Sequence, residues 1–193
     1  GKHIRNELGL MEFSAMAKFE VSGPGAAAWL DRIMANRLPK PGRIVLTPML
    51  SAKGRIAGDF SISCLGQDRF LVLGADHMQI AFMRYFNATL PETGVNLLNR
   101  SSELGGLHLC GPRSQELMQR IAQHDMASKD FPFMSAAQMT MGGIDKVNVL
   151  RVSFTGETGY EMYLPMSMQP PLFDLLYKEG QSLGLKLVGT RSL

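Results

Sequence analysis

Several features that commonly mark a function are scarce or missing in this sequence. Cysteine occurs twice among 193 residues, and neither Cys64 nor Cys110 belongs to a Cys-x-x-Cys pair or has a histidine at ligand spacing. We therefore expect two buried free thiols in a reducing compartment, and neither a disulfide framework nor a zinc site. The four histidines are isolated from one another, which argues against any other metal site.

Long apolar runs are missing as well. No run approaches the roughly 18 residues of a membrane-spanning helix, and no signal peptide opens the chain. With 45% hydrophobic and 19% charged residues, the composition is that of an ordinary soluble globular protein. We expect a location in the cytoplasm, or in the mitochondrial matrix of a eukaryote, and no membrane partner.

Lysine and arginine are scattered, and no basic stripe is present. The net charge of +3 and the isoelectric point of about 9.0 are therefore weak support for a nucleic-acid binder, and we expect no nucleic-acid partner. No glycine-rich dinucleotide loop or phosphate-binding loop occurs, and no sequence context supports Ser/His/Asp or Cys/His catalysis. Nothing in the sequence indicates the oligomeric state.

The pattern of apolar residues predicts alternating strands and helices. Helices are expected after Pro24, with an apolar face that includes Trp29 and Ile33, and at 77–90, where a stripe of methionine and phenylalanine is typical of core. Two further helices are expected, from Pro112 to about 123 and from about 168 to 183. Strands are expected at 11–21, 43–50, 55–64, 70–73, 95–98, 136–141 and 146–154.

One unit of structure occurs twice. Val21-Ser-Gly-Pro24, followed by Trp29, Leu30, Arg32 and Ile33, corresponds to Leu109-Cys-Gly-Pro112, followed by Leu117, Met118, Arg120 and Ile121, with a constant offset of 88 residues. This repeat predicts two similar α+β subdomains of mixed, mainly antiparallel sheet with helices. We place them at 1–102 and 103–193, with the boundary in the polar stretch 99–103.

The stretch Arg151–Pro165 carries the main candidate for chemistry. It predicts a strand, a turn in which Gly156 and Gly159 flank Glu157, and a second strand on which Glu161 alternates with Tyr160 and Met162. One interpretation is a hairpin with two solvated glutamates. The other is a pocket in which Glu161 accepts hydrogen bonds from the adjacent N–H donors of a pterin or guanine, beside an aromatic wall from Phe154 or Tyr160. Spacing alone does not decide between them.

Asp59 is the second candidate, because it lies within an apolar alternating strand directly after Gly58, which predicts a partly buried carboxylate. It would then stabilise a cationic intermediate or accept a proton from an amine. The alternative is an edge-strand acid bound to an arginine or a turn amide. His108 alternates into an apolar strand and is interpreted as a core residue with satisfied hydrogen bonds.

These residues resemble the glycine-cleavage T-protein, or aminomethyltransferase, family. Phe154-Thr-Gly-Glu157-Thr-Gly-Tyr-Glu161-Met is similar to that family's segment of an aromatic residue, Thr-Gly-Glu, any residue, Gly, an aromatic residue and Glu. Thr47–Asp59 is similar to its strand pair, and Gly9-Leu10 with Val21–Pro24 to its opening. Within the family, the motifs Gly54-Arg-Ile-Ala-Gly-Asp59 and Phe154-Thr-Gly-Glu157 look most like those of the C-terminal folate domain of flavin-dependent dimethylglycine and sarcosine dehydrogenases or oxidases.

The resemblance implies three subdomains around a central folate site, of which this chain would hold the first and most of the second. The start without methionine and the end at Leu193, where a new apolar pattern begins, fit a fragment that follows an FAD domain. The cofactor would be tetrahydrofolate, with FAD only in a separate domain or subunit that acts as partner. Glu161 would bind the pterin edge and Phe154 would pack near it, with Glu157, Tyr160 and Met49 also at the site, and Asp59 would be the acid beside N5 or N10.

Three departures from the family pattern bear on the reaction. Gly58-Asp59 stands where T-proteins usually have an Asp-Asp pair, Ala75 stands where an Asn is common, and a folate-contacting Arg aligns near Leu193. They favour an enzyme domain that captures a one-carbon unit from an N-methylated amine as 5,10-methylenetetrahydrofolate, in partnership with a flavin domain. The alternatives are glycine-cleavage T-protein proper and a folate-binding scaffold without catalysis.

Overall fold

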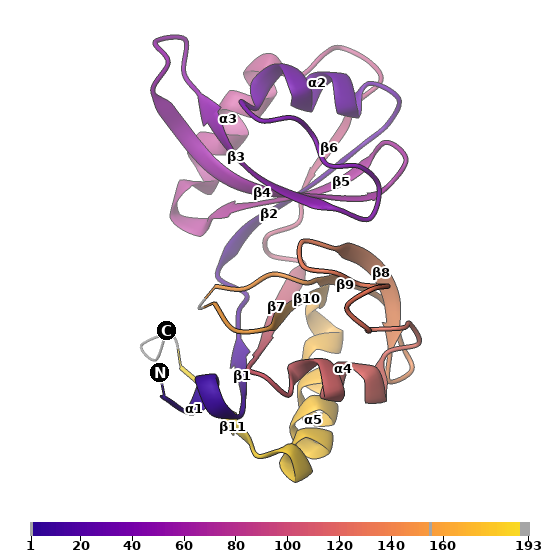
Figure 1. Ribbon diagram of the computed structural model, residues 1–193. Coiled ribbons are helices and arrows are strands. Elements are labelled where there is room, and N and C mark those ends of the chain that lie inside the picture. Colours follow the sequence, from indigo (N-terminus) through magenta and orange to yellow (C-terminus); the bar gives the residue numbers. More distant parts are fainter. Residues whose placement is uncertain (1, 155, 190–193) are drawn as a thin grey trace. The chain divides into compact units, whose positions relative to one another are not determined.

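The computed structural model describes residues 2–154 and 156–189, and the chain divides into two compact units (Figure 1). Unit 2 is the continuous segment Ala15–Ser102, and unit 1 combines Gly1–Ser14 with Glu103–Leu193. The division expected from the sequence assigned the whole of 1–102 to one subdomain. The structure differs because the residues up to Ser14 belong with the second half of the chain.

Unit 2 is a five-stranded antiparallel sheet with two helices on one face (Figure 1). Phenylalanine rings from sheet and helices meet in its core, including Phe19 with Phe86, whose centroids lie 5.2 Å apart, and Phe60 with Phe82 at 4.6 Å. Along the chain its elements are β2 Met16–Ser22, α2 Ala26–Ile33, β3 Ile44–Leu50, β4 Ile56–Gly66, β5 Arg69–Ala75, the 3-10 turn η1 Asp76–Met78, α3 Gln79–Thr89 and β6 Asn96–Asn99. The strand order is β3-β4-β5-β2-β6.

Unit 1 is a six-stranded sheet covered on one face by α4 and α5. Its elements are α1 Lys2–Asn6, β1 Leu8–Glu12, β7 Leu104–Cys110, α4 Ser114–Ile121, β8 Ala136–Met141, β9 Ile144–Leu150, β10 Gly159–Pro165, the 3-10 turn η2 Met166–Met168, α5 Gln169–Gly180, the 3-10 turn η3 Gln181–Leu183 and β11 Leu185–Leu187. The strand order is β11-β1-β7-β10-β9-β8, antiparallel except for the parallel pair β1–β11. The α+β class with mainly antiparallel sheets is thus confirmed.

The internal repeat extends beyond the short motif that reveals it. The pair β2–α2 and the pair β7–α4 have the same lengths and an offset of 88 residues, and β5 and β10 are related by an offset of 90. Pairing registers agree as well, since Glu20 lies opposite Leu71 in unit 2 while His108 lies opposite Glu161 in unit 1. The two units therefore present equivalent positions that can be compared residue by residue.

The repeat also explains why β1 belongs to unit 1. In unit 2, β6 pairs antiparallel with β2, and the carbonyl of Gly94, just before β6, lies against Gly23. In unit 1 the equivalent place beside β7 is filled by β1, and the carbonyl of Glu7, just before β1, lies against Gly111. The strand after the last helix, β11, is displaced to the edge. The N-terminal strand β1 thus completes the sheet of unit 1, whose other strands come from the second half of the chain.

Two strands expected from the sequence have different bounds in the structure. The strand expected at 11–21 is two strands in two units, because residues 13–15 connect β1 to β2. The strand expected at 146–154 ends at Leu150, and the described residues before β10, 151–154 and 156–158, belong to no helix or strand; they are called the loop 151–158 below. Both cysteines are free and buried, and burial raises the pKa of the Cys110 thiol to about 11. None of the helices in the described part of the chain has the length and apolarity of a membrane span.

Candidate ligand-binding site

Strand β10 presents two different faces. Tyr160, Met162 and Leu164 point into the apolar core beneath the helices, as period-two alternation requires. Glu161 and Tyr163 point to the opposite face of the same sheet, where both are buried. The interpretation of this segment as a hairpin with two solvated glutamates is therefore wrong for Glu161, which is 9% exposed.

The Glu161 carboxylate is held by one neighbour on its own strand. The hydroxyl of Tyr163 donates a hydrogen bond of 2.8 Å to Glu161 Oε2, as expected for side chains two residues apart on one face. Burial raises the pKa of Glu161 to about 7, and the hydrogen bond from Tyr163 opposes this rise. The hydrogen bond thus fixes the orientation of the carboxylate, and each of its oxygens keeps a lone pair that can accept a further hydrogen bond.

His108 lies directly across from Glu161 on β7. Residues that pair in this way carry their side chains on the same face, with Cβ atoms about 5 Å apart. The imidazole is 1% exposed and packs against the ring of Phe13, tilted by 44° with 5.6 Å between centroids. Neither of its nitrogens has a hydrogen-bond partner among the described residues. The expectation of a satisfied core histidine is wrong, and burial lowers the pKa of His108 to about 4.

The repeat shows that the fold does not need polar groups at the positions of Glu161 and Tyr163. At the equivalent register in unit 2, Leu71 and Leu73 take the places of Glu161 and Tyr163, and both leucines are buried. A buried carboxylate and an unpartnered imidazole both destabilise a protein relative to apolar side chains. Their presence in unit 1 alone is therefore typical of a site that binds something, since strained polar groups persist where function requires them.

The opposite pKa shifts of Glu161 and His108 predict opposite effects on stability. Glu161 binds its proton more tightly in the native protein, so its contribution to the free energy of unfolding declines as pH rises from 4.5 to about 7. His108 binds its proton less tightly, so its contribution declines as pH falls from 6.5 to about 4. Relative to the parent protein, Glu161→Gln should gain stability with rising pH and His108→Leu should lose it, each by up to about 3 kcal/mol.

Chemical denaturation at several pH values between 4 and 8 measures both differences. The parent protein itself should show a weak dependence in the range where the two trends oppose each other. A difference between Glu161→Gln and parent that stays constant across this range would mean that the carboxyl group titrates normally. The same result for His108→Leu would mean that the imidazole is hydrated and accessible to protons.

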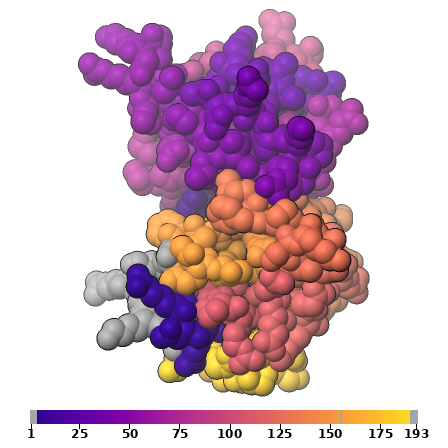
Figure 2. Space-filling model, viewed as in Figure 1, coloured from indigo at the N-terminus to yellow at the C-terminus, as the bar shows by residue number. Residues whose placement is uncertain are grey.

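A pocket of about 390 Å³ opens where the loop 151–158 enters β10. Glu157 lies in it half-buried, with its Oε1 atom 3.6 Å from Arg5 Nε. Gly159 belongs both to this pocket and to the sheet, where a Cβ added to it would lie 3.3 Å from Cε1 of His108. The lining residues are Phe133, Arg151, Ser153, Gly156, Glu157, Thr158 and Gly159, and the loop is at the surface in light orange in Figure 2.

Arg151 forms one wall of this pocket without being available as a free cation. Its guanidinium donates to the carbonyl of Phe131 and, at 3.1 Å, to Ser128 Oγ. It also lies over the ring of Tyr160, 5.8 Å from the centroid. Arg151 therefore fixes the base of the loop, and the other polar residues that line the pocket are Ser153, Glu157 and Thr158.

The other residues expected at the site are dispersed. Phe154 is on the loop and 68% exposed, so it forms no wall around Glu161 in this structure. Tyr160 faces the core on the opposite side of β10, and its hydroxyl has no hydrogen-bond partner in the described part of the chain. Met49 is buried in the core of unit 2 and lines no pocket that the structure describes. The structure thus brings Glu161 together with His108 and Tyr163, while Phe154 is exposed, Tyr160 faces the core and Met49 belongs to unit 2.

Asp59 lies in unit 2, in a different unit from Glu161, and its side chain is exposed. The expected partial burial is wrong, because strand alternation turns Asp59 outward while Gly58 and Phe60 face the core. A Cβ added to Gly58 would lie 2.7 Å from the Phe60 ring and 2.8 Å from the Phe82 ring. An Asp-Asp pair therefore does not fit here, because aromatic packing has replaced the first acid.

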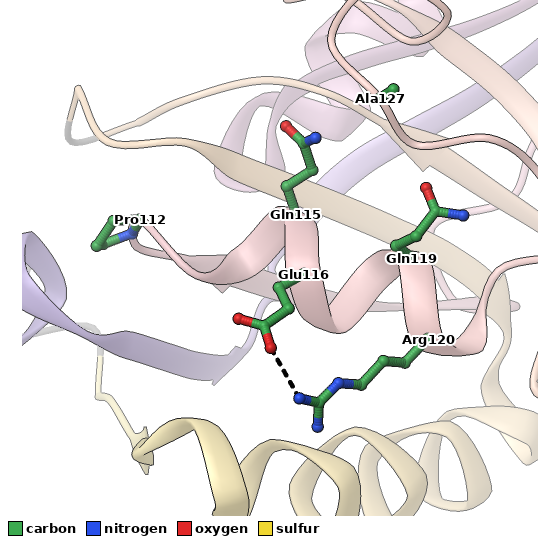
Figure 3. A pocket seen from close by; sticks show the side chains of 6 residues that line it. All are labelled: Pro112, Gln115, Glu116, Gln119, Arg120 and Ala127. Atoms are coloured by element: carbon green, nitrogen blue, oxygen red, sulfur yellow. Dashed lines mark hydrogen bonds and ion pairs between the residues drawn. The ribbon is translucent and has the colours of Figure 1, made fainter.

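A second hollow of about 620 Å³ lies over α4 (Figure 3). Its polar side chains already bind one another: Arg120 donates to Glu116 at 2.8 Å and to Ser182 at 2.9 Å, and Gln119 accepts from the backbone of Met126. A ligand would have to displace these contacts, so we do not consider it a candidate site. Among the described residues no group of three His, Cys, Asp or Glu is placed to hold a metal ion.

The sequence analysis does not assign Tyr163 or His108 to the site of Glu161, for different reasons. Tyr163 is two positions after Glu161, and strand alternation alone would have placed it beside the carboxylate. The sequence places His108 on an apolar strand. Its pairing with Glu161, however, depends on the register of two strands more than fifty residues apart, which no local pattern specifies. The role of Arg151 depends on its hydrogen bonds to residues 128 and 131, which lie in a segment without helix or strand.

Comparison with known proteins gives a consistent result. A family model described as "GCVT N-terminal domain" matches residues 1–193. The chain is 26% identical to mitochondrial dimethylglycine dehydrogenase of Homo sapiens, over all of this chain and 22% of that protein. It is 32% identical to an aminomethyltransferase of Halothermothrix orenii, over 95% of this chain and 51% of that protein. The chain therefore spans about half or less of the length of these curated relatives.

Solved structures show the same fold. The glycine cleavage system aminomethyltransferase T from Bartonella henselae superposes with a TM-score of 0.82 at 21% identity, over 97% of this chain and 49% of that one. Heterotetrameric sarcosine oxidase from Corynebacterium sp. U-96, in complex with pyrrole 2-carboxylate, gives a TM-score of 0.75 at 19% identity, over 94% of this chain and 87% of that one.

Proposed function

The chain belongs to the GCVT N-terminal domain family, and on this premise we propose that it is a tetrahydrofolate-binding, aminomethyltransferase-like domain. It captures a one-carbon unit from an N-methylated amine of the dimethylglycine or sarcosine type as 5,10-methylenetetrahydrofolate. The curated relatives support the two halves of this proposal, since they include both aminomethyltransferases and a dimethylglycine dehydrogenase. The cellular location that we propose is the cytoplasm, or the mitochondrial matrix of a eukaryote.

The observation that carries the proposal is the buried Glu161 carboxylate. Tyr163 donates to one of its oxygens, and the equivalent position of unit 2 holds the apolar Leu71. An amino-pyrimidinone edge has two adjacent N–H donors, which a carboxylate accepts at matching spacing. The residues present thus fit a pterin, with Glu161 as the acceptor of its N–H edge.

The proposed reaction divides between this chain and a partner. Tetrahydrofolate supplies the two amines, N5 and N10, that take up the one-carbon unit. Glu161 orients the pterin, and Asp59 stabilises positive charge beside the reacting amine. The sequence offers no oxidant of its own, so oxidation of the amine to an iminium or to formaldehyde is assigned to a flavin domain or subunit, where FAD would bind. Phe154, exposed on its loop, would cover the pterin when the ligand is bound.

Calorimetric titration with tetrahydrofolate tests the proposal directly. We expect a dissociation constant in the micromolar range, with little change between two salt concentrations, because recognition of the pterin edge is local and buried. The titration is made with the 193-residue chain and with the whole natural protein in which it occurs. Absence of binding in both would overturn the proposal, and affinity that falls steeply with salt would favour a polyanion instead.

Replacement of Asp59 separates catalysis from binding. Asp59→Asn keeps the size of the side chain and removes its charge, so tetrahydrofolate should bind within about twofold of the parent affinity. Formation of 5,10-methylenetetrahydrofolate should be slower by about 100- to 1000-fold, the range expected for loss of one preorganised electrostatic group. The measurement is product formation by the whole natural protein with its amine substrate.

Asp31→Asn is the matched control, because Asp31 is also an exposed acid in unit 2, on α2. It should leave both binding and rate unchanged. If Asp59→Asn retains the full rate, Asp59 has no catalytic role. If the parent protein binds tetrahydrofolate but forms no product, the domain is a folate-binding scaffold, which is the alternative function.

A further inference from the structure

A buried imidazole with two unpartnered nitrogens lies beside the proposed pterin-binding carboxylate. His108 is 1% exposed, and Phe13 packs against its ring on one side. Its Cε1 atom lies close to Gly159, which has no side chain and lines the pocket at the loop 151–158. The ring is therefore confined by β7, β10 and Phe13, and neither of its buried nitrogens has a hydrogen-bond partner among the described residues.

The unpartnered nitrogens are not explained by the needs of the fold. At the equivalent register in unit 2, Glu20 takes the place of His108 and is partly exposed, with Arg69 and Arg100 within 4 Å of its carboxylate. Each unit thus fills this position differently, and only unit 1 places an unpaired polar ring next to a buried acid. An orphaned polar group of this kind destabilises the free protein unless a ligand completes its hydrogen bonds.

We propose that His108 is a second ligand-binding residue, which donates a ring N–H to the carbonyl oxygen of the amino-pyrimidinone whose N–H edge Glu161 accepts. The inference rests on the proposed function and deepens it. A neutral imidazole carries one donor and one acceptor, and the low pKa of His108 keeps the ring neutral at pH 7. Glu161 accepts and His108 donates, so the pair matches a ring in which an N–H and a C=O are adjacent.

The pairing defines a specificity. A carboxylate alone accepts from any ligand with adjacent N–H groups, whereas a carboxylate beside an N–H donor requires an oxo group next to those donors. Oxo-pterins and guanine-like rings have this arrangement of groups. His108 is therefore a specificity-determining residue, which acts on the same ring as Glu161.

Three proteins test the inference by titration with tetrahydrofolate. His108→Leu removes the donor, and affinity should fall by about five- to twentyfold, the range for a buried hydrogen bond left without its partner. His108→Gln keeps an N–H donor and should bind within about threefold of the parent protein. His77→Leu, which changes an exposed histidine in unit 2, is the matched control and should bind as the parent does.

A second measurement separates ligand contact from a structural role. The ring ¹⁵N resonances of His108, assigned by their loss in His108→Gln, should move on addition of tetrahydrofolate, while those of His77 and His124 stay in place. His108→Leu should also unfold a few degrees higher than the parent protein, because the orphaned polar group is gone. Such a rise shows that weaker binding does not result from a damaged fold.

The outcomes divide clearly. If the parent protein binds tetrahydrofolate but His108→Leu binds equally well, the inference is wrong and the proposed function stands. If His108→Leu binds weakly while the ring resonances of the parent protein do not move, His108 supports the strand only, which also overturns the inference. If the parent protein does not bind tetrahydrofolate in any form, the proposed function fails and the inference with it.

Discussion

Replacing Gly111 with alanine is expected to lower the free energy of unfolding by more than about 3 kcal/mol, which is a large share of the stability of a small domain. Gly111 has φ of +120°, which side chains rarely adopt, and a Cβ built on it would lie 2.1 Å from the carbonyl oxygen of Glu7 and 3.1 Å from that of Ile4. Both obstacles are backbone atoms, so no side chain can move aside. Relief would require β1 to leave its place beside β7.

Gly143→Ala is the matched control for this variant. Gly143 also has positive φ, +84°, but no atom lies within 4 Å of a Cβ built there. It should therefore lose only the 1–2 kcal/mol or so of left-handed backbone strain. Urea denaturation followed by far-UV circular dichroism measures both. If Gly111→Ala is no less stable than Gly143→Ala, the contact between the Glu7 carbonyl and the Gly-Pro turn does not hold β1 in the sheet.

Loss of the Glu161 carboxylate is expected to weaken tetrahydrofolate binding by about 10- to 100-fold, or roughly 1.4 to 2.8 kcal/mol. The side chain is the buried acceptor for the pterin N–H edge, and in Glu161→Ala those donors would face an empty space in a dry environment. The variant also leaves the buried Tyr163 hydroxyl without its acceptor, which costs about 1–3 kcal/mol of stability, so its folded state is checked by circular dichroism before the titration. Calorimetric titration of parent and variant gives the difference.

Two further variants sharpen this test. Glu161→Gln keeps one carbonyl acceptor and should fall between Glu161→Ala and the parent protein. Glu92→Ala removes an exposed glutamate from unit 2 and should bind as the parent does. If Glu161→Ala binds tetrahydrofolate with parent affinity, the pterin is not read by this carboxylate, and Glu157 in the neighbouring pocket becomes the next residue to replace.

The sequence was sufficient for those parts of the fold that local pattern determines. The apolar face of α2, the strand β8 and the offset of 88 between the Gly-Pro units follow from the sequence alone, because hydrophobic periodicity and turn residues are local features. Membership of β1 in unit 1 was not predictable in this way. Its partner β7 is almost a hundred residues away, and no alternation pattern specifies which of two similar sheets a strand completes.

The site was predicted in part for the same reason. Glu161 was recognised as a carboxylate among apolar neighbours, and the structure buries it as that pattern requires. Asp59 was expected to be partly buried by the same argument, but the strand turns it outward, since Gly58 carries the aromatic packing. A one-residue choice of face decides between the two outcomes, and it depends on tertiary contacts. The roles assigned to both residues remain predictions.

The interruption of unit 1 by unit 2 has a consequence during synthesis. At the point of entry and exit, Lys18 N donates to Ser101 Oγ at 2.9 Å, and within unit 1 Gly106 N donates to Ser14 Oγ across 92 residues of chain. As the nascent polypeptide leaves the ribosome, the inserted domain can complete its own sheet first, while β1 waits for β7 to be translated. Joining Ser14 to Glu103 by a short turn would make β1 and β7 a β-hairpin within unit 1. The segment Ala15–Ser102 would then be produced as a separate protein.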